Sequence, residues 1–370
     1  MKIELLKYKL YIIIYFLIFY GILINPDLFP KEIILMYLVI ISVLEFKFLK
    51  ANFNKVKFFV LLSLISMISF VLRDSYNNAS LGLFFMFYPI LLLSYQQKKI
   101  GSQIQLILLV IYSAVVLQHV IPGGDANDIF VNRSRNIVSF YCLILVIHYY
   151  IEKYRYQKKI PLWPALLSMT ISLYCIGRAG ILTSALLLSL IVFMKLRKIN
   201  FIKTFKYGVL LLITSIISAA YGLQLMVTKF IDLSLFKLRD RGLDDSSREL
   251  VVFNYLNDMS DNIFNFILGV PLDNNSVYAD LEFNLHNSFL NAHYYFGIFS
   301  LIIFFYIFKA LFKKAGDLFY KGLLLVLLIR GISDKLFFTG LNDVIIFYLI
   351  FLILGSVDVK SVNGQEELQN

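Results

Sequence analysis

The sequence predicts an all-α polytopic membrane protein with about twelve transmembrane helices. Hydrophobic residues make up 59% of the 370 residues, and the mean hydropathy is +0.76. Charged residues make up 16%, compared with about 25% in soluble proteins. The apolar stretches approach the roughly twenty residues that a helix needs to cross a bilayer, and they lack the alternation of a barrel strand. A helical bundle follows from these observations.

The hydrophobic stretches predict twelve spans in chain order. The first follows three lysines and has no small-x-small cleavage site, so we expect it to remain as an uncleaved span. The second is short and carries Glu45 near its end. The expected segments are 8–24, 32–46, 57–72, 80–95, 101–121, 136–151, 161–176, 180–196, 204–223, 288–308, 318–332 and 342–357.

The distribution of lysine predicts the orientation of the chain. Alternate connections are rich in Lys and Arg, for example around Lys47 to Lys57, Lys153 to Lys159 and Lys309 to Lys321. Basic residues in short loops favour the cytoplasmic side. We therefore expect both termini in the cytoplasm, with a short cytoplasmic tail over residues 358–370.

One connection differs from all the others in length. Residues 224–287 separate the first nine expected spans (1–223) from the last three (288–357). Loops longer than about fifteen residues are usually functional or disordered. This loop contains apolar residues at helical spacing, and it leads into the sequence His286-Asn287-Ser288. We expect a functional loop on the non-cytoplasmic side that carries short helices.

Several classes of site are disfavoured. The formal charge of +11 is spread between hydrophobic segments, so we expect no nucleic-acid partner. Cys142 and Cys175 both lie in apolar stretches, which favours packing over a disulfide or a metal site. Neither an H-E-x-x-H nor a G-x-S-x-G hydrolase motif occurs. No paired Asp motif suited to a metal occurs either, and we expect no metal and no cofactor.

Arginine predominates among the basic residues on the expected outer side. Topology rules disfavour positive charge there, so its presence calls for another explanation. Guanidinium groups bind phosphate or carboxylate bidentately, which makes an anion site one interpretation. The alternative is that each Arg pairs with a nearby Asp, such as Asp128 or Asp334. The arginines are Arg73, Arg133, Arg135, Arg178, Arg239, Arg241, Arg248 and Arg330.

Two short segments place Arg at the start of an expected helix. Arg133 and Arg135 open the sixth span, where backbone N–H groups favour anions. An interfacial cap with snorkelling side chains explains the same pattern. Arg178 is the centre of a four-residue connection, Gly177-Arg178-Ala179-Gly180. Charge so close to the membrane is costly unless it faces a cavity or partner, which indicates function.

The long loop and its end supply two further candidates. Ser246 and Glu249 match a capping box, which predicts a helix with Arg248 in its first turn. That helix is either an anion site or a surface cover for the bundle. His286 stands where the chain re-enters the membrane, at a helix start with Asn287 or Ser288 as cap. An imidazole accepts a proton at physiological pH, so His286 is a candidate base. His119, His148 and His293 have the character of packing or interface residues.

In the order of these features the chain resembles the O-antigen polymerase and O-antigen ligase superfamily, which includes the Wzy-type and WaaL-type proteins. The matching pieces are the Gly177-Arg178-Ala179-Gly180 segment, the long outer loop with Ser247-Arg248, and His286-Asn287-Ser288-Phe289-Leu290 followed by Gly297. The resemblance implies a metal-independent glycosyltransferase with a GT-C-like bundle and a lipid-linked donor. It implies that Arg178 and Arg248 hold the donor diphosphate, with His286 as base.

The same resemblance implies further roles and partners. Arg133, Arg135, Arg330 and Asn287 become candidates for binding the substrate diphosphate or sugar. The expected partners are an undecaprenyl-diphosphate-linked oligosaccharide, the lipid bilayer and a chain-length regulator protein. The implied location is the bacterial inner membrane, with the active site on the periplasmic face.

The sequence leaves the particular reaction open between three functions. Abundant Tyr and Phe, the composition of an AT-rich gene and short, degenerate motifs favour a polymerase that joins repeat units, because such genes vary with each sugar repeat. A ligase that transfers finished glycan to lipid A-core needs the same diphosphate site. A flippase or transporter also suits twelve spans, although we find no internal repeat between the two halves.

Overall fold

The computed structural model describes residues 2–24, 30–73, 76–97, 102–130, 134–198, 246–272, 278 and 284–355. Every regular element within these residues is helical. The N-terminal helices are α1 (Lys2–Ile24), α2 (Lys31–Leu44), α3 (Phe46–Ala51), α4 (Phe53–Arg73), α5 (Tyr76–Gln97) and α6 (Ser102–Val120). The middle of the chain forms η1 (Ala126–Asp128), α7 (Arg135–Gln157), α8 (Trp163–Cys175) and α9 (Arg178–Lys198). The remaining elements are α11 (Ser246–Asp261), α12 (Ile263–Leu268), α14 (Ser288–Phe296), η3 (Gly297–Phe299), α15 (Ser300–Phe312), α16 (Leu318–Ile332) and α17 (Asp343–Leu354).

The length and composition of the helices define a multi-pass membrane protein. Within the described ranges, six helical segments are long and apolar enough to cross a membrane. Two shorter apolar helices, α8 and α17, accompany them. The six segments are Phe53–Leu72, Asn78–Tyr95, Ser102–Val120, Arg135–Gln157, Arg178–Arg197 and Ser288–Phe312.

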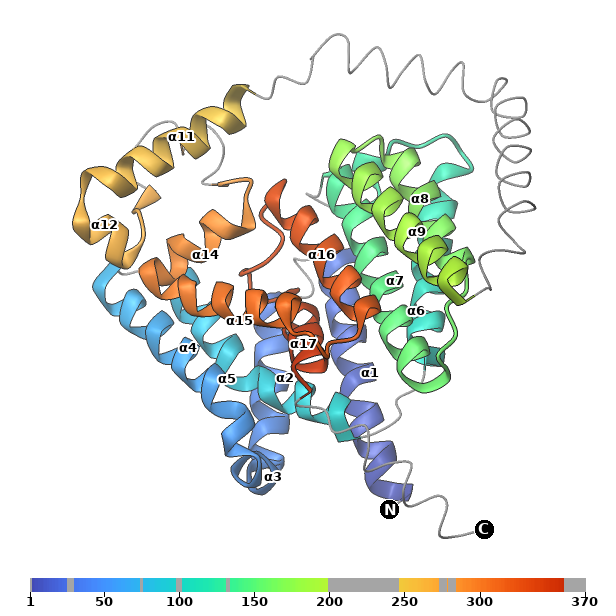
Figure 1. Ribbon diagram of the computed structural model, residues 1–370, viewed down its shortest axis with the longest axis horizontal. Coiled ribbons are helices and arrows are strands. Elements are labelled where there is room, and N and C mark those ends of the chain that lie inside the picture. Colours follow the sequence, from blue (N-terminus) through green and yellow to red (C-terminus); the bar gives the residue numbers. More distant parts are fainter. Residues whose placement is uncertain are drawn as a thin grey trace.

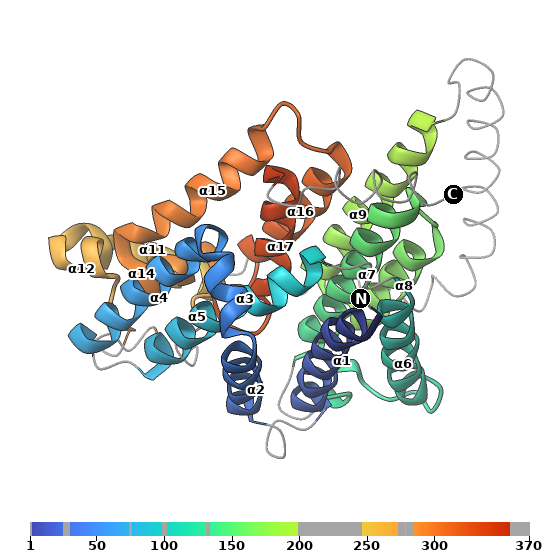
Figure 2. The ribbon, with the colours of Figure 1, turned by 90° about the horizontal axis from the view of Figure 1, so that it is seen from below.

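Helix α7 is the most deeply buried of the six candidate spans among the described residues, with 89% of its apolar segment inside the protein. It packs against α6, α8 and α9, and α9 packs in turn against α16. On the other side, α4 and α5 pair closely, and α5 contacts α1, α2 and α17 (Figure 1). The view from below separates α4 and α5 from α6, α7, α8 and α9, with α16 and α17 between them (Figure 2). A helix that is apolar on every face belongs inside a large bundle, and nine of the twelve residues of α17 are buried accordingly.

Helices on the outside of the bundle present apolar side chains outwards. Leu61 and Leu64 on α4, and Phe305 and Phe308 on α15, are more than two-fifths exposed. Exposed apolar patches of this kind are rare on soluble monomers and are typical of a membrane-facing surface. The belt of side chains agrees with the membrane character expected from composition.

Helices occupy the expected hydrophobic segments throughout the described residues, with different ends. The expected span 204–223 lies outside the described residues. The expected second span ends earlier than residue 46, because α2 stops at Leu44 and Glu45 forms a break before α3. Glu45 is buried there and accepts a hydrogen bond from Tyr11 Oη at 3.0 Å, while Lys7 forms an ion pair with it. The polar side chain ends the helix instead of continuing it.

The expected span 288–308 is one helix in the sequence pattern and two in the structure. Helix α14 ends at Phe296, and η3 separates it from α15. Gly297 has φ of +54°, and a Cβ atom at this position would overlap the carbonyl oxygen of Ile267 at the end of α12. Only glycine fits such a close approach of two backbones. The break therefore marks the place where the long loop docks on the bundle.

Replacing Gly297 by alanine is expected to destabilise the protein by more than the usual cost of positive φ. That usual cost is about 1–2 kcal/mol for a residue with a Cβ. Gly123 provides a matched control, because its φ is +80° but no atom lies within 4 Å of its would-be Cβ. Thermal unfolding in detergent should show a larger loss for Gly297→Ala than for Gly123→Ala. Equal losses would contradict the close approach of α12.

Candidate functional site

Three charged or titratable side chains meet where α14 begins and α16 ends. His286 Nδ1 lies 3.8 Å from Asp334 Oδ1, and Arg330 Nη2 lies 3.9 Å from Asp334 Oδ2. Arg330 Nη2 also donates to the carbonyl oxygen of Asn136, at 3.2 Å, in the first turn of α7. We call His286, Arg330, Asp334 and the backbone of Asn136 the His286 cluster. It joins three elements that are far apart in the sequence.

The backbone around His286 is held in an uncommon conformation. His286 has φ of +47°, the left-handed region that few non-glycine residues adopt. Its N–H donates to Asn284 Oδ1 at 3.0 Å. Asn287 then caps α14, since its Oδ1 accepts from the N–H groups of Phe289 and Leu290. Local side-chain hydrogen bonds therefore turn the chain sharply at the imidazole and start the helix immediately after it.

Ser288 ties the start of α14 to the segment that follows α16. Its hydroxyl donates to the carbonyl oxygen of Asp334 at 2.8 Å and accepts from the N–H groups of Leu336 and Phe337. One turn later, the Asn291 amide donates to the carbonyls of Phe337 and Phe338. These buried bonds fix the position of Asp334 relative to His286.

Arg330 is completely buried, with 0% of its side chain exposed. Its Nη1 donates to Ser333 Oγ at 3.1 Å, and its guanidinium lies over the Phe140 ring at 5.8 Å. A buried charge needs a partner of opposite sign, and Asp334, four residues later, provides it. The sequence interpretation of Arg330 as a substrate-binding residue does not fit a side chain with no exposed surface. The guanidinium instead contacts Asp334 and the first turn of α7.

Small residues bring the start of α9 against the start of α7. A Cβ at Gly177 would come within 2.6 Å of Asn136 Oδ1, and one at Gly180 within 2.5 Å of Ser139 Oγ. This close approach places Arg178, the first residue of α9, beside the first turn of α7. Arg178 is exposed and Arg135, the first residue of α7, is half-buried. The helix starts that carry the two arginines therefore meet at Asn136, whose backbone carbonyl belongs to the His286 cluster.

The three remaining predicted site residues are Asn287, Arg133 and Arg248. Asn287 uses its carboxamide oxygen as the cap of α14. Arg133 lies outside the described residues. Arg248 lies in the first turn of α11, as the capping-box pattern predicts, and its side chain is outside the described part of the chain.

His293 fastens the helices of the long loop to α14. Its Nε2 lies 3.0 Å from the carbonyl oxygen of Phe266, and its Nδ1 lies 2.9 Å from Tyr255 Oη. Because a carbonyl only accepts, Nε2 carries the proton and Nδ1 accepts from the tyrosine. This pair of bonds agrees with an interface role for His293, and it connects α11 and α12 to the helix that follows His286.

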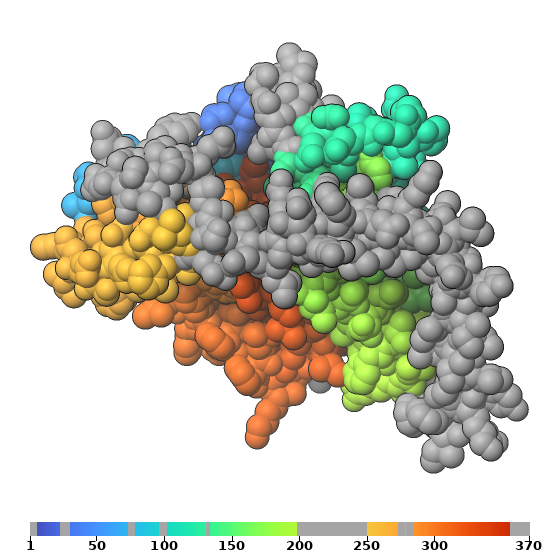
Figure 3. Space-filling model, turned by 90° about the horizontal axis from the view of Figure 1, so that it is seen from above, coloured from blue at the N-terminus to red at the C-terminus, as the bar shows by residue number. Residues whose placement is uncertain are grey.

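Helices α11 and α12 also expose apolar side chains beside the site. In the space-filling view their yellow surface adjoins the orange surface of α14 and α15 (Figure 3). Phe253 on α11 is 62% exposed and Phe264 on α12 is 67% exposed. The exposed set is Leu250, Phe253, Leu256, Ile263, Phe264, Phe266 and Ile267. Such a patch is typical of a surface that meets membrane or an apolar ligand.

A second buried polar network was not anticipated from the sequence. Tyr348 Oη donates to Glu152 Oε1 at 2.7 Å, and Arg155 Nη1 donates to Tyr348 Oη and to the carbonyl oxygen of Tyr95. Glu152 and Arg155 lie three residues apart on α7, and His148, one turn before Glu152, stacks on the Tyr95 ring at 6.1 Å. That spacing of polar residues along one face of an apolar helix is the signal that could have found the network.

The sequence pattern predicts Asp334 only as an ion-pair partner for an arginine. It gives no sign that the same carboxylate also faces His286. Its neighbour Lys335 is largely desolvated, which lowers the pKa of that ammonium, and the charge of Lys31 adds a smaller effect in the same direction.

No group of three or more His, Cys, Asp or Glu side chains gathers into a metal-binding arrangement within the described ranges.

Comparison of the chain with protein-family models, curated proteins and solved structures gave no match. The class of protein is therefore defined by its own helices and site: a multi-pass helical membrane protein with a His-Asp-Arg cluster.

Replacing Ser288 by alanine is expected to loosen the segment that holds Asp334. The change leaves the buried N–H of Phe337 without its acceptor, at a cost of about 1–3 kcal/mol, whereas the N–H of Leu336 keeps its bond to the carbonyl oxygen of Asp334 at 3.1 Å. Ser94 is a matched control, because it is equally buried but only donates to Ile90 one turn earlier in its own helix. Thermal unfolding should show a clear loss for Ser288→Ala and little for Ser94→Ala. A loss of the same size in both variants would count against this role.

Proposed function

We propose that this protein is a membrane-embedded glycosyltransferase that joins oligosaccharide repeat units carried on undecaprenyl diphosphate, as a polymerase of O-antigen or a related surface polysaccharide. The contact of His286 with Asp334, beside the helix starts that carry Arg135 and Arg178, is the observation that carries the proposal. The proposal includes a twelve-span, GT-C-like bundle in the bacterial inner membrane. Both termini are then cytoplasmic and the His286 cluster is periplasmic.

His286 acts as the general base. The acceptor sugar hydroxyl attacks the anomeric carbon of the donor, its proton passes to the imidazole, and the bond between that carbon and the diphosphate oxygen breaks. Because Nδ1 faces Asp334, we assign the transferred proton to Nε2. The carboxylate orients the ring and stabilises the imidazolium that forms, as an acidic partner does for catalytic histidines in other enzymes.

The arginines act on the leaving group. Undecaprenyl diphosphate gains negative charge as the anomeric bond breaks, so fixed guanidinium groups bind the transition state more strongly than the ground state. Arg178, with Arg135 nearby and Arg248 from the loop, takes this role. Arg330 acts indirectly, by holding Asp334 in place.

The apolar surface of α11 and α12 supports a lipid-linked substrate. Its exposed side chains continue towards Phe299 of η3 and the outward-facing residues of α15. A polyprenyl chain that stays in the membrane would meet this surface while its diphosphate lies at the water boundary. A soluble sugar nucleotide has no apolar chain that would contact such a surface.

His286→Ala is expected to abolish polymerisation in a deletion strain that carries the variant gene. A positioned base contributes about 10²–10⁴-fold to rate, so polymer should fall below detection on a lipopolysaccharide gel. His119→Ala, which removes an imidazole that is not part of the cluster, is the control. One repeat unit on the core is the expected pattern, whereas bare core would indicate a ligase. Unchanged polymer length and amount would remove the base assignment.

Arg178→Lys is expected to lower kcat by about tenfold or more while the protein stays folded. Lysine keeps the charge but cannot form the two parallel hydrogen bonds of a guanidinium. Extension of a purified lipid-diphosphate repeat unit in vitro measures the effect, with Arg197→Lys at the far end of α9 as control. EDTA should leave the wild-type rate unchanged. Full activity of Arg178→Lys would show that this residue does not hold the diphosphate.

A further inference from the structure

A cavity of about 640 Å³ lies at the other end of α7 from the His286 cluster. It opens between the C-terminal end of α7, the start of α8 and the C-terminal end of α9. Lys153 is seventeen positions beyond Asn136 on α7, which places it roughly 25 Å along the helix axis from the cluster. The cavity therefore belongs to a different part of the molecule from the proposed sugar-transfer site.

Four lysines from three segments line this cavity: Lys153, Lys158, Lys159 and Lys195. Helix α7 ends with Lys158 in the left-handed conformation, with φ of 52°, so the chain reverses and brings Lys158 and Lys159 back beside Lys153. Lys195 comes from the last turns of α9. The lysines lie close together because the chain reverses after α7 and because α9 ends beside it.

Lys158 lies over the Tyr154 ring, at 4.3 Å, and the other three lysines supply the charge that a ligand would meet. No carboxylate among the described residues lies within ion-pair distance of Lys153, Lys159 or Lys195. Glu152, next to Lys153 on α7, is buried and bonds to Tyr348 instead. The carbonyl ends of α7 and α9 offset the repulsion only in part. A bound anion would complete the neutralisation.

The rest of the cavity is apolar and aromatic. Trp163, the only tryptophan in the chain, is 42% exposed and its ring lies 5.8 Å from that of Tyr149. Ile160 and Met194 supply buried apolar surface. Tryptophan is typical of the boundary between lipid and water. A ligand that fits must be anionic at one end and apolar at the other.

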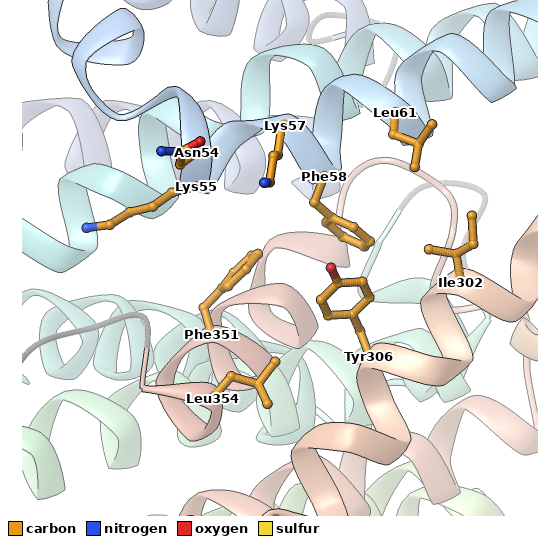
Figure 4. Close-up of a pocket in the computed structure, with 9 residues that line it drawn as sticks. All are labelled: Asn54, Lys55, Lys57, Phe58, Leu61, Ile302, Tyr306, Phe351 and Leu354. Carbon is orange, nitrogen blue, oxygen red and sulfur yellow. The ribbon is translucent and has the colours of Figure 1, made fainter.

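A second cavity, of about 440 Å³, provides a comparison because it has fewer basic residues. It lies between α4, α15 and α17 and is lined mainly by apolar side chains (Figure 4). The rings of Phe58 and Tyr306 meet there at 4.5 Å, while Lys55 points away from them (Figure 4). It has two lysines instead of four, and no tryptophan.

We propose that the cavity beside Trp163 binds an anionic phospholipid with two phosphates, of the cardiolipin class. The lysines bind the phosphates, and the surface formed by Trp163, Tyr149 and Met194 receives an acyl chain. Basic pockets between membrane helices on the cytoplasmic side are suited to such headgroups. The expected orientation places this cavity in the cytoplasmic leaflet. The bound lipid ties the ends of α7 and α9 together.

The native tryptophan allows a direct test. The full-length protein in phosphatidylcholine micelles is titrated with cardiolipin or phosphatidylcholine whose acyl chains are brominated, and Trp163 fluorescence is recorded. Brominated cardiolipin should quench at much lower mole fraction than brominated phosphatidylcholine. Equal quenching by the two lipids would overturn the proposal. Displacement of cardiolipin by millimolar inorganic phosphate alone would also overturn it, because the site would then recognise a free anion.

A charge variant tests the lysines themselves. Each lysine near a lipid surface changes affinity by about fivefold, so the triple variant Lys153→Gln, Lys159→Gln, Lys195→Gln should weaken cardiolipin binding about a hundredfold. Lys55→Gln with Lys57→Gln, in the second cavity, is the matched control and should leave the quenching curve unchanged. Unfolding midpoints in phosphatidylcholine check that both variants fold. Retained cardiolipin preference in the triple variant would refute the role of these lysines.

Discussion

A buried guanidinium is the constraint on which the site depends. Arg330 has no exposed surface, and an ionised group in such a place is tolerated only when partners surround it. Those partners come from three directions: Asp334 after the same helix, Ser333 at its end, and the backbone of Asn136 on α7. Satisfying this one charge fixes the end of α16 against the start of α7. The same ion pair fixes the position of Asp334, and His286 lies next to this carboxylate.

The two ends of α7 have different chemistry within one helix. At its start, backbone and small residues allow α9 and α16 to approach closely, so that polar side chains are brought to one place. At its far end, lysines surround an apolar cavity with an aromatic wall. Between them, His148, Glu152 and Arg155 face the interior with Tyr348. The helix therefore connects the polar His286 cluster at its start to the basic cavity at its end through a buried polar face.

Sequence reasoning recovered the elements better than their breaks. Long apolar stretches predict helices because burial and backbone satisfaction in a membrane leave few other choices. The sequence pattern does not predict that Glu45, which contacts Tyr11 and Lys7, lies at the end of α2. It also does not predict that a helix breaks at Gly297, where α12 packs closely against the backbone. Both depend on residues distant in sequence. The pattern predicts that Arg178 and His286 share one site, whereas the contact of His286 with Asp334 required the three-dimensional path of the chain.

Main-chain bonds hold the segment between α16 and α17. Ser288, Asn291, Asn342 and Asp343 contact its carbonyl and N–H groups, and Tyr15 Oη donates to the carbonyl of Leu341. Its shape is thus independent of the side chains that reach its surface, chiefly Lys335 and Thr339. The hydrogen bonds that hold the segment use none of the side-chain atoms of Lys335 or Thr339. Substitutions at these two positions would therefore alter the chemistry of the segment without removing the bonds that hold its main chain.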